Sequence, residues 1–185
     1  MKKLLLVAAV ALLSLPGYVN AQGKYFTREG RIQFNSKSTV EKIEGVNKKV
    51  TSIIDSETGQ MEFSILMKAF EFEKALMQEH FNENYVESEK FPQATFKGKV
   101  NEKIDLTKDG ENKVTVTGKM SLQGVTKDVT AEGTITKKGD DLVVVSTIKI
   151  KVADYNIKVP SLYVQNIAEV VDVNVNITLE PFVKK

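Results

Sequence analysis

The chain has 185 residues, of which 42% are hydrophobic and 27% charged, with no cysteine and one histidine. This length and apolar fraction suit one folded domain and argue against disorder and fibrous repeats. Because cysteine is absent, disulfide scaffolds, zinc–thiolate sites, iron–sulfur clusters and thiol nucleophiles are excluded. The fold must therefore be stabilised by packing and backbone pairing alone.

Residues 1–21 have the pattern of a cleaved secretory signal peptide. Two lysines come first, an apolar run follows over residues 4–15, and small residues precede a cleavage point after Ala21. We predict cleavage there, a mature domain over residues 22–185 and a periplasmic location. An apolar run of about 12 residues is shorter than the roughly 20 that span a bilayer, so no stable membrane insertion is expected.

The mature chain has no excess of basic residues. Cleavage removes two of the 26 basic residues and none of the 24 acidic ones, which leaves equal numbers of each. A protein that binds nucleic acid needs cationic side chains to neutralise the phosphate backbone. We therefore expect no nucleic-acid partner.

Apolar and polar residues alternate along most of the mature chain, most strictly from Val171 to Glu180. Successive strand side chains point to opposite faces, so this alternation predicts strands with one buried face. Polar, glycine-containing loops at 55–59, 108–112 and 138–141 indicate antiparallel hairpins. We predict eight strands, near residues 24–37, 46–55, 60–71, 94–103, 112–122, 126–137, 141–153 and 168–181.

The period changes between Glu73 and Glu87. Apolar side chains recur there every three to five residues, which predicts one short amphipathic helix beside the sheet. Long strands with one apolar face favour closure of the sheet, so the fold class is all-β: an extended eight-stranded antiparallel barrel with this helix. Such a barrel is either filled by its own side chains or holds one small ligand.

Small residues interrupt the inward-facing apolar positions of several predicted strands. Two interpretations remain open: they leave unfilled volume inside the barrel, or they mark bends and bulges where strands turn a corner. The residues concerned are Ser36, Ser38, Gly98, Gly118, Ala131, Gly133 and Ser146.

Phenylalanine and methionine are prominent among the remaining inward positions, and such a surface accommodates flexible hydrocarbon. Each of these residues also suits an ordinary core. The predicted lining of an apolar cavity consists of Phe63, Ile65, Met67, Phe70, Phe72, Met77, Phe81, Phe96, Met120, Leu122 and Ile148.

Catalytic and metal-binding patterns are missing. His80 is the only histidine, and the chain has no Gly-x-Ser-x-Gly elbow, dinucleotide loop or phosphate-binding loop. Asp105, Thr107 and Asp109 resemble the start of a calcium loop, but Val116 stands where the loop needs a bidentate Glu. We predict no catalytic residue, no metal site and no cofactor.

Two segments resemble the signatures of the YceI-like family. They are the run Phe91–Phe96, with a Phe-Pro pair and a following Phe, and the run Gly118–Lys127, which ends in Gly-Val-Thr-Lys. The early Ile32–Phe34 segment, the helix with Phe81 and the late segment Asp154–Pro160 support the resemblance, which covers essentially the whole mature chain.

The resemblance implies an extended barrel similar to lipocalins that binds a polyisoprenoid or other amphiphilic lipid in the periplasm, without catalysis. This chain departs from many relatives, however. It reads Asn35-Ser36-Lys37-Ser38 in place of a Lys-His pair after the first strand, and Met77-Gln78-Glu79-His80 in place of an Arg-Asp pair on the helix. The family's polar contacts near the cavity mouth therefore do not carry over.

Three functions remain at this point: a lipid-binding carrier or sensor, a structural or stress-response barrel with a filled interior, and an enzyme acting on a lipid in the barrel. Lys97, Lys127 and His80 are candidates to meet an anionic head group. Leu66, Val143 and Val145 are apolar at positions predicted to face water, so they suggest a homodimer or are scattered exposed aliphatics.

Overall fold

The computed structural model describes residues 23–182, so the predicted signal peptide over 1–21 lies outside the described residues. Nine strands dominate it: β1 (Lys24–Lys37), β2 (Lys42–Asp55), β3 (Gln60–Leu66), β4 (Phe70–Phe72), β5 (Gln93–Val100), β6 (Gly110–Leu122), β7 (Val125–Lys138), β8 (Asp141–Lys151) and β9 (Val170–Pro181). The helical segments are α1 (Ala75–His80), a π-helical turn (Phe81–Tyr85) and 3₁₀ turns at Met67–Ala69, Val152–Tyr155 and Ser161–Tyr163.

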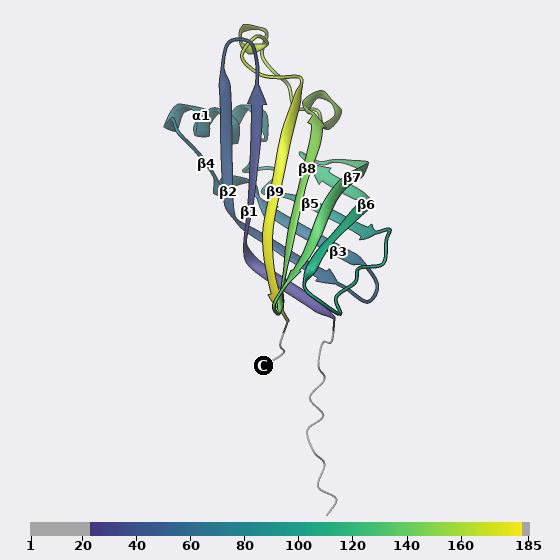
Figure 1. Cartoon of the computed structure of the whole chain (residues 1–185). Coiled ribbons are helices and arrows are strands. Elements are labelled where there is room, and N and C mark those ends of the chain that lie inside the picture. Colours follow the sequence, from purple (N-terminus) through teal and green to yellow (C-terminus); the bar gives the residue numbers. More distant parts are fainter. Residues whose placement is uncertain (1–22, 183–185) are drawn as a thin grey trace, which may run out of the picture.

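The strands form one closed antiparallel ring. Neighbours follow the order β1-β9-β8-β7-β6-β5-β3-β2, and β1 also pairs with β2, which closes the sheet. β4 pairs with β2 beyond the end of β3, so β3 and β4 act as one interrupted strand in an eight-stranded barrel. In Figure 1 the tall strands β1, β2 and β9 run the length of the barrel, and α1 lies beside its upper end. The predicted all-β barrel with one short helix is confirmed.

The expected strand over residues 60–71 is broken by the 3₁₀ turn at Met67–Ala69. The Leu66 carbonyl accepts a hydrogen bond from the buried side-chain amide of Asn47 at 2.8 Å. The Met67 N–H donates to the Pro92 carbonyl at 2.9 Å. Because these contacts satisfy the backbone groups at the break, the chain can leave the ladder without burying unpaired polar groups.

The expected helix over residues 73–87 is shorter than predicted. After the six residues of α1 the backbone widens into the π-helical turn, where the Val86 N–H donates to the Phe81 carbonyl at 3.0 Å. Glu87 then takes a left-handed φ of 46°, which ends the helical run. Phe81, the first residue of this turn, packs toward the barrel against Phe34 and Phe70.

The lower half of the barrel is a filled core. Its most deeply buried side chains are Ile54, Ile135, Leu142, Ile177 and Leu179, which come from the ends of four different strands. The loop 101–109, between β5 and β6, adds the buried Ile104 and places Leu106 against the same cluster. This end of the barrel is therefore closed by apolar side chains.

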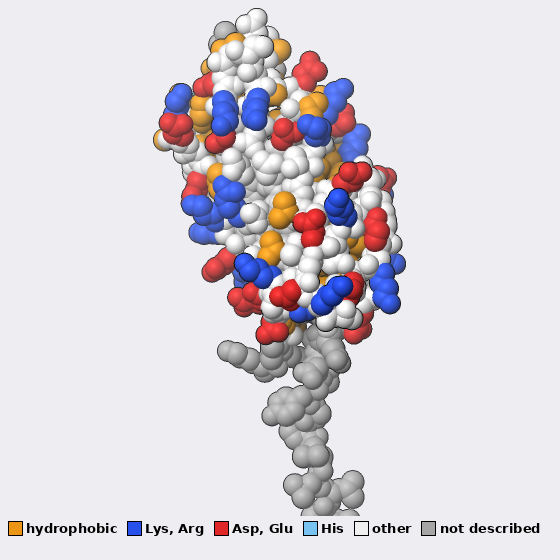
Figure 2. Space-filling view, in the orientation of Figure 1, with side chains coloured by type: hydrophobic (Ala, Val, Ile, Leu, Met, Phe, Trp, Pro, Cys, Tyr) orange, Lys and Arg blue, Asp and Glu red, His pale blue; other side chains and the backbone are white. Residues whose placement is uncertain are grey.

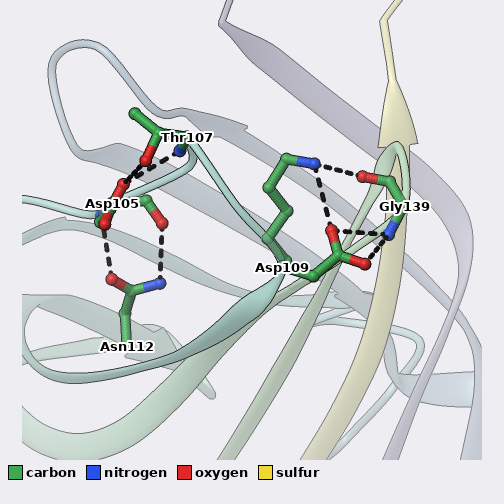
Figure 3. Close-up of polar contacts among 6 residues, drawn as sticks. Asp105, Thr107, Asp109, Asn112 and Gly139 are labelled. Carbon is green, nitrogen blue, oxygen red and sulfur yellow. Dashed lines mark hydrogen bonds and ion pairs between the residues drawn. The ribbon is translucent and has the colours of Figure 1, made fainter.

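Polar contacts fasten that loop to the barrel, as Figure 3 shows. The Asp105 carboxylate accepts from the Thr107 N–H at 2.9 Å and from its hydroxyl at 2.6 Å, and Asn112 binds the Asp105 backbone. The Asp109 carboxylate accepts from the Gly139 N–H at 3.0 Å, in the β7–β8 turn. These bonds favour the ionised acids, so the Thr107 contacts lower the pKa of Asp105 and the Gly139 contact lowers the pKa of Asp109.

Charges of both signs are interspersed on the outer surface. Figure 2 shows Lys and Arg side chains next to Asp and Glu side chains over one face of the barrel, with hydrophobic side chains at isolated spots. Several pairs bridge neighbouring strands, including Lys119 with Asp128 at 2.8 Å and Lys149 with Asp172 at 2.7 Å. The face shown in Figure 2 thus presents no field of a single sign to a charged partner.

Candidate functional site

A cavity of about 460 Å³ occupies the half of the barrel nearest α1. Its volume falls within the range of small-molecule sites in proteins. All the side chains predicted from the sequence to line an apolar interior lie on its wall: Phe63, Ile65, Met67, Phe70, Phe72, Met77, Phe81, Phe96, Met120, Leu122 and Ile148. The structure thus brings the predicted set together, and its role in binding a ligand stays a prediction.

The small residues predicted to face inward had two possible roles, to leave unfilled volume or to mark bends and bulges in the strands. Ser36, Ala131, Gly133 and Ser146 line the cavity, as small residues that leave volume should. Ser38 does not, because it lies in the turn after β1, where its hydroxyl accepts hydrogen bonds from the N–H groups of Val40 and Glu41. The interior is filled below and hollow above.

Gly98 and Gly118 serve a third purpose that neither interpretation anticipated. They pair directly across β5 and β6 in a ladder without a bulge. A Cβ on Gly98 would lie 2.5 Å from Cζ of Phe96, and one on Gly118 would lie 2.7 Å from the same atom. The Phe96 ring therefore lies flat over the two glycines, so it lines the cavity wall instead of filling the lumen.

Four phenylalanines attach the helical segment to the barrel. Phe34 of β1 stacks on Phe81 at 5.4 Å between ring centroids, and its ring lies 5.6 Å from those of Phe70 and Phe72. Phe81 in turn contacts Phe70 at 5.3 Å and Phe72 at 5.0 Å. Edge and stacked aromatic contacts of this kind add to the burial of the rings. Phe34 was absent from the predicted lining, although it follows Ile32 in the same inward phase.

The charged lining residues gather at one end, which we call the mouth. It is formed by the turn 37–42, α1 with the preceding Lys74, and the segment 156–167. Glu41 connects all three, because its carboxylate lies 3.6 Å from Nζ of Lys74 and accepts a hydrogen bond from Nδ2 of Asn166 at 3.3 Å. The hydroxyl of Ser36 accepts from the Ala168 N–H at 2.8 Å. The contribution of segment 156–167 was not predicted, because an irregular connection has no periodicity.

The three head-group candidates separate in the structure. His80 lines the mouth, where its ring lies 6.1 Å from that of Tyr163. Lys97 points outward and forms an ion pair with Glu62 at 3.2 Å, and Lys127 is exposed on the outer wall. Placing Lys97 and Lys127 near the cavity was wrong, since Lys97 directly follows the inward-facing Phe96 and must point to the opposite face.

The deep part of the cavity contains no ionised side chain. Among the described lining residues, the Asp, Glu, Lys, Arg and His side chains are confined to Glu41, Lys74 and His80 at the mouth. Tyr85 also lines the cavity, and its burial raises the pKa of its hydroxyl, which favours the neutral form. The site can therefore accept an apolar chain with little desolvation of charge.

Residues 23–182 contain neither a metal-ligand cluster nor a membrane-spanning helix. Within that range no group of three or more His, Asp or Glu side chains lies close enough to hold a metal ion. In the same described part of the chain, no helix has the length and apolarity to cross a membrane. A second hollow, on the outer side of α1, is open and lined by charged and amide side chains such as Glu79, Asn82 and Lys90.

A closed barrel of this size with one apolar cavity is an architecture of small-ligand binding proteins. The chain matches the YceI-like domain over residues 25–179, and it belongs to the YceI-like family. No protein of curated function matches it.

Solved structures share the fold. A polyisoprenoid binding domain from Saccharophagus degradans, implicated in plant cell wall breakdown, superposes with a TM-score of 0.73 at 15% identity, over 86% of this chain and 99% of that one. BcnA of Burkholderia cenocepacia gives 0.68 at 20% identity, over 80% and 95%. The YceI protein of Campylobacter jejuni gives 0.58 at 20% identity, over 72% and 82%.

Proposed function

We propose that this protein holds a polyisoprenoid or a similar amphiphilic lipid in the cavity and acts without catalysis, as a carrier, by sequestration or in a stress-related role. The observation that carries the proposal is the apolar cavity of about 460 Å³, closed below by the filled core and open at a polar mouth. The Saccharophagus degradans domain, which shares the fold, is described as polyisoprenoid binding.

The hydrocarbon tail supplies the binding energy in this proposal. Burial of each methylene group is worth about 0.8 kcal/mol, so a tail of about ten such groups gains about 8 kcal/mol before the entropic cost of association is subtracted. The cavity wall needs no salt bridge for this. The head group lies at the mouth, near His80, Tyr163 and the Glu41–Lys74 pair.

Residues 1–21 support export, and we propose that the mature protein acts in the periplasm. A lipid tail cannot cross an aqueous compartment unaided, so a soluble barrel with an apolar interior suits that location. Homodimerisation stays a prediction. Leu66 and Val145 are exposed, but β5, β6 and β7 separate their strands, and Val143 is half-buried.

The test uses protein purified from its native host. Organic extraction followed by mass spectrometry is expected to recover a prenyl or other long-chain lipid, and repeated recovery of empty protein contradicts the proposal. Added prenyl alcohols, prenyl phosphates and quinones are then compared by thermal unfolding, since a ligand that binds only the folded state raises Tm. A barrel with a purely structural role shows no bound lipid and no shift with any of the three. Formation of a product from a bound lipid would show that the protein is an enzyme and not a carrier.

A further inference from the structure

Three strongly exposed aliphatic side chains surround the mouth. Val40 in the turn 37–42 is 61% exposed, Leu76 on α1 is 60% exposed, and Val164 in the segment 156–167 is 55% exposed. Isolated exposed aliphatics are common on protein surfaces. Here, however, each of the three segments that form the mouth contributes one.

These three side chains, which we call the apolar rim, are continuous with the cavity. Leu76 lines the cavity with one side while it remains exposed to solvent. Val40 directly precedes the lining residue Glu41, and Val164 directly follows the lining residue Tyr163. Because Glu41 contacts both Lys74 and Asn166, the three segments are held together as one unit.

The charges around the rim neutralise each other. Glu41 pairs with Lys74, and Glu44 pairs with Lys42 at 2.6 Å. The mature chain as a whole carries equal numbers of basic and acidic residues. A partner of the rim therefore gains nothing from long-range electrostatic attraction, and the contact depends on apolar burial.

We infer that the apolar rim docks the mouth reversibly onto the surface of a phospholipid bilayer, with Val40, Leu76 and Val164 entering the boundary between head groups and acyl chains. The inference rests on the proposed function. A tail that left a bilayer through water would expose all its methylene groups, at a cost that grows with each of them. Docking of the mouth lets the tail slide from the acyl layer into the cavity. Three side chains with no excess of basic residues beside them give a weak contact, as a carrier that must leave again requires.

The test measures flotation of the mature protein with vesicles of phosphatidylcholine. A rim variant combines Val40→Ser, Leu76→Gln and Val164→Ser. The matched control combines Leu66→Gln and Val145→Thr, which change aliphatics that are 42% and 45% exposed on the barrel wall. All five positions are exposed, and unchanged Tm and circular dichroism verify that both variants fold. We expect the wild type and the control to float at low and high salt alike, and the partition coefficient of the rim variant to fall at least about tenfold.

Equal flotation of the rim variant and the wild type overturns the inference. So does flotation that requires anionic lipid and disappears in high salt, because it would show an electrostatic contact. A change in oligomeric state of the rim variant, seen by analytical ultracentrifugation together with unchanged flotation, would assign the rim to a second copy of the chain instead.

A second measurement separates this inference from the proposed function. Binding of a detergent-dispersed long-chain prenyl alcohol, followed by thermal shift, needs the cavity but no bilayer. A rim variant limited to Val40→Ser and Val164→Ser, two positions that do not line the cavity, should bind it as the wild type does, while its rate of prenyl alcohol uptake from vesicles falls at least about threefold. Loss of detergent-dispersed binding in the wild type would contradict the proposed function and leave the flotation result intact.

Discussion

The ring of Phe34 lies across Gly45 on the neighbouring strand. The two residues are directly opposite in the β1–β2 ladder, and a Cβ on Gly45 would lie only 2.9 Å from Cζ of Phe34. The missing side chain is therefore what allows Phe34 to lie flat and stack on Phe81. The same relationship holds between Phe96 and the pair Gly98 and Gly118. In this barrel, Gly45, Gly98 and Gly118 keep aromatic rings against the wall and the lumen free.

We predict that Gly45→Ala destabilises the protein by about 1–3 kcal/mol, because the added methyl group forces the Phe34 ring out of its position. Urea unfolding measures the change. The double-mutant cycle with Phe34→Leu is the decisive control, since a smaller side chain makes room for the methyl group. Gly45→Ala should then cost less in the Phe34→Leu background than in the wild type. Additive effects would contradict the proposed contact.

A bulky side chain placed on the cavity wall should block binding while leaving the fold intact. Ala131 on β7 lines the cavity, whereas the adjacent Thr130 is exposed on the outer wall. We expect Ala131→Phe to abolish the rise in Tm caused by prenyl compounds, because the new ring occupies the volume of the tail. Thr130→Phe adds the same ring to the same strand and should leave that rise unchanged. If Ala131→Phe still responds fully, the lipid lies elsewhere.

The strand pattern and the cavity lining were predictable because both follow from local alternation. A period of two identifies the face of each strand residue without knowledge of its partners, and it placed Phe63 and Ile148 on the wall. Met77 and Phe81 came instead from helical spacing. The outward position of Lys97 follows from the same alternation, because this residue directly follows an inward-facing one.

Features that depend on strand register or on distant residues could not be predicted from the sequence. The role of Gly98 requires knowing that it lies opposite Gly118, which only the β5–β6 register reveals. The break after Leu66 depends on Asn47, 19 residues earlier. The contribution of Asn166 to the mouth depends on Glu41, 125 residues away. The periodicity of one segment cannot reveal which residues of another segment it contacts.

The closed end of the barrel should lose stability in acid. Hydrogen bonding lowers the folded-state pKa of Asp109 below the value of about 3.9 expected for an unfolded chain. An acid of this kind stabilises the fold above its unfolded pKa, and the contribution is lost as the pH falls through the folded-state pKa. We therefore expect the free energy of unfolding to decrease below about pH 4, and Asp109→Asn to reduce this dependence. Asp140→Asn in the same turn, which takes no part in the contact with Gly139, should retain it.

Glu41 should control how fast a ligand exchanges more than how stable the protein is. Its ion pair with Lys74 is partly exposed, and such pairs contribute less than about 1 kcal/mol. Glu41→Ala removes the contacts to both Lys74 and Asn166, so the three segments of the mouth can separate. We expect a small change in Tm, faster amide hydrogen exchange in segment 156–167 and faster release of a bound prenyl alcohol. Glu44→Ala breaks the Lys42 pair next to the same turn without touching the other two segments, and it should change neither rate. If the two variants release the ligand equally fast, Glu41 does not hold the mouth together.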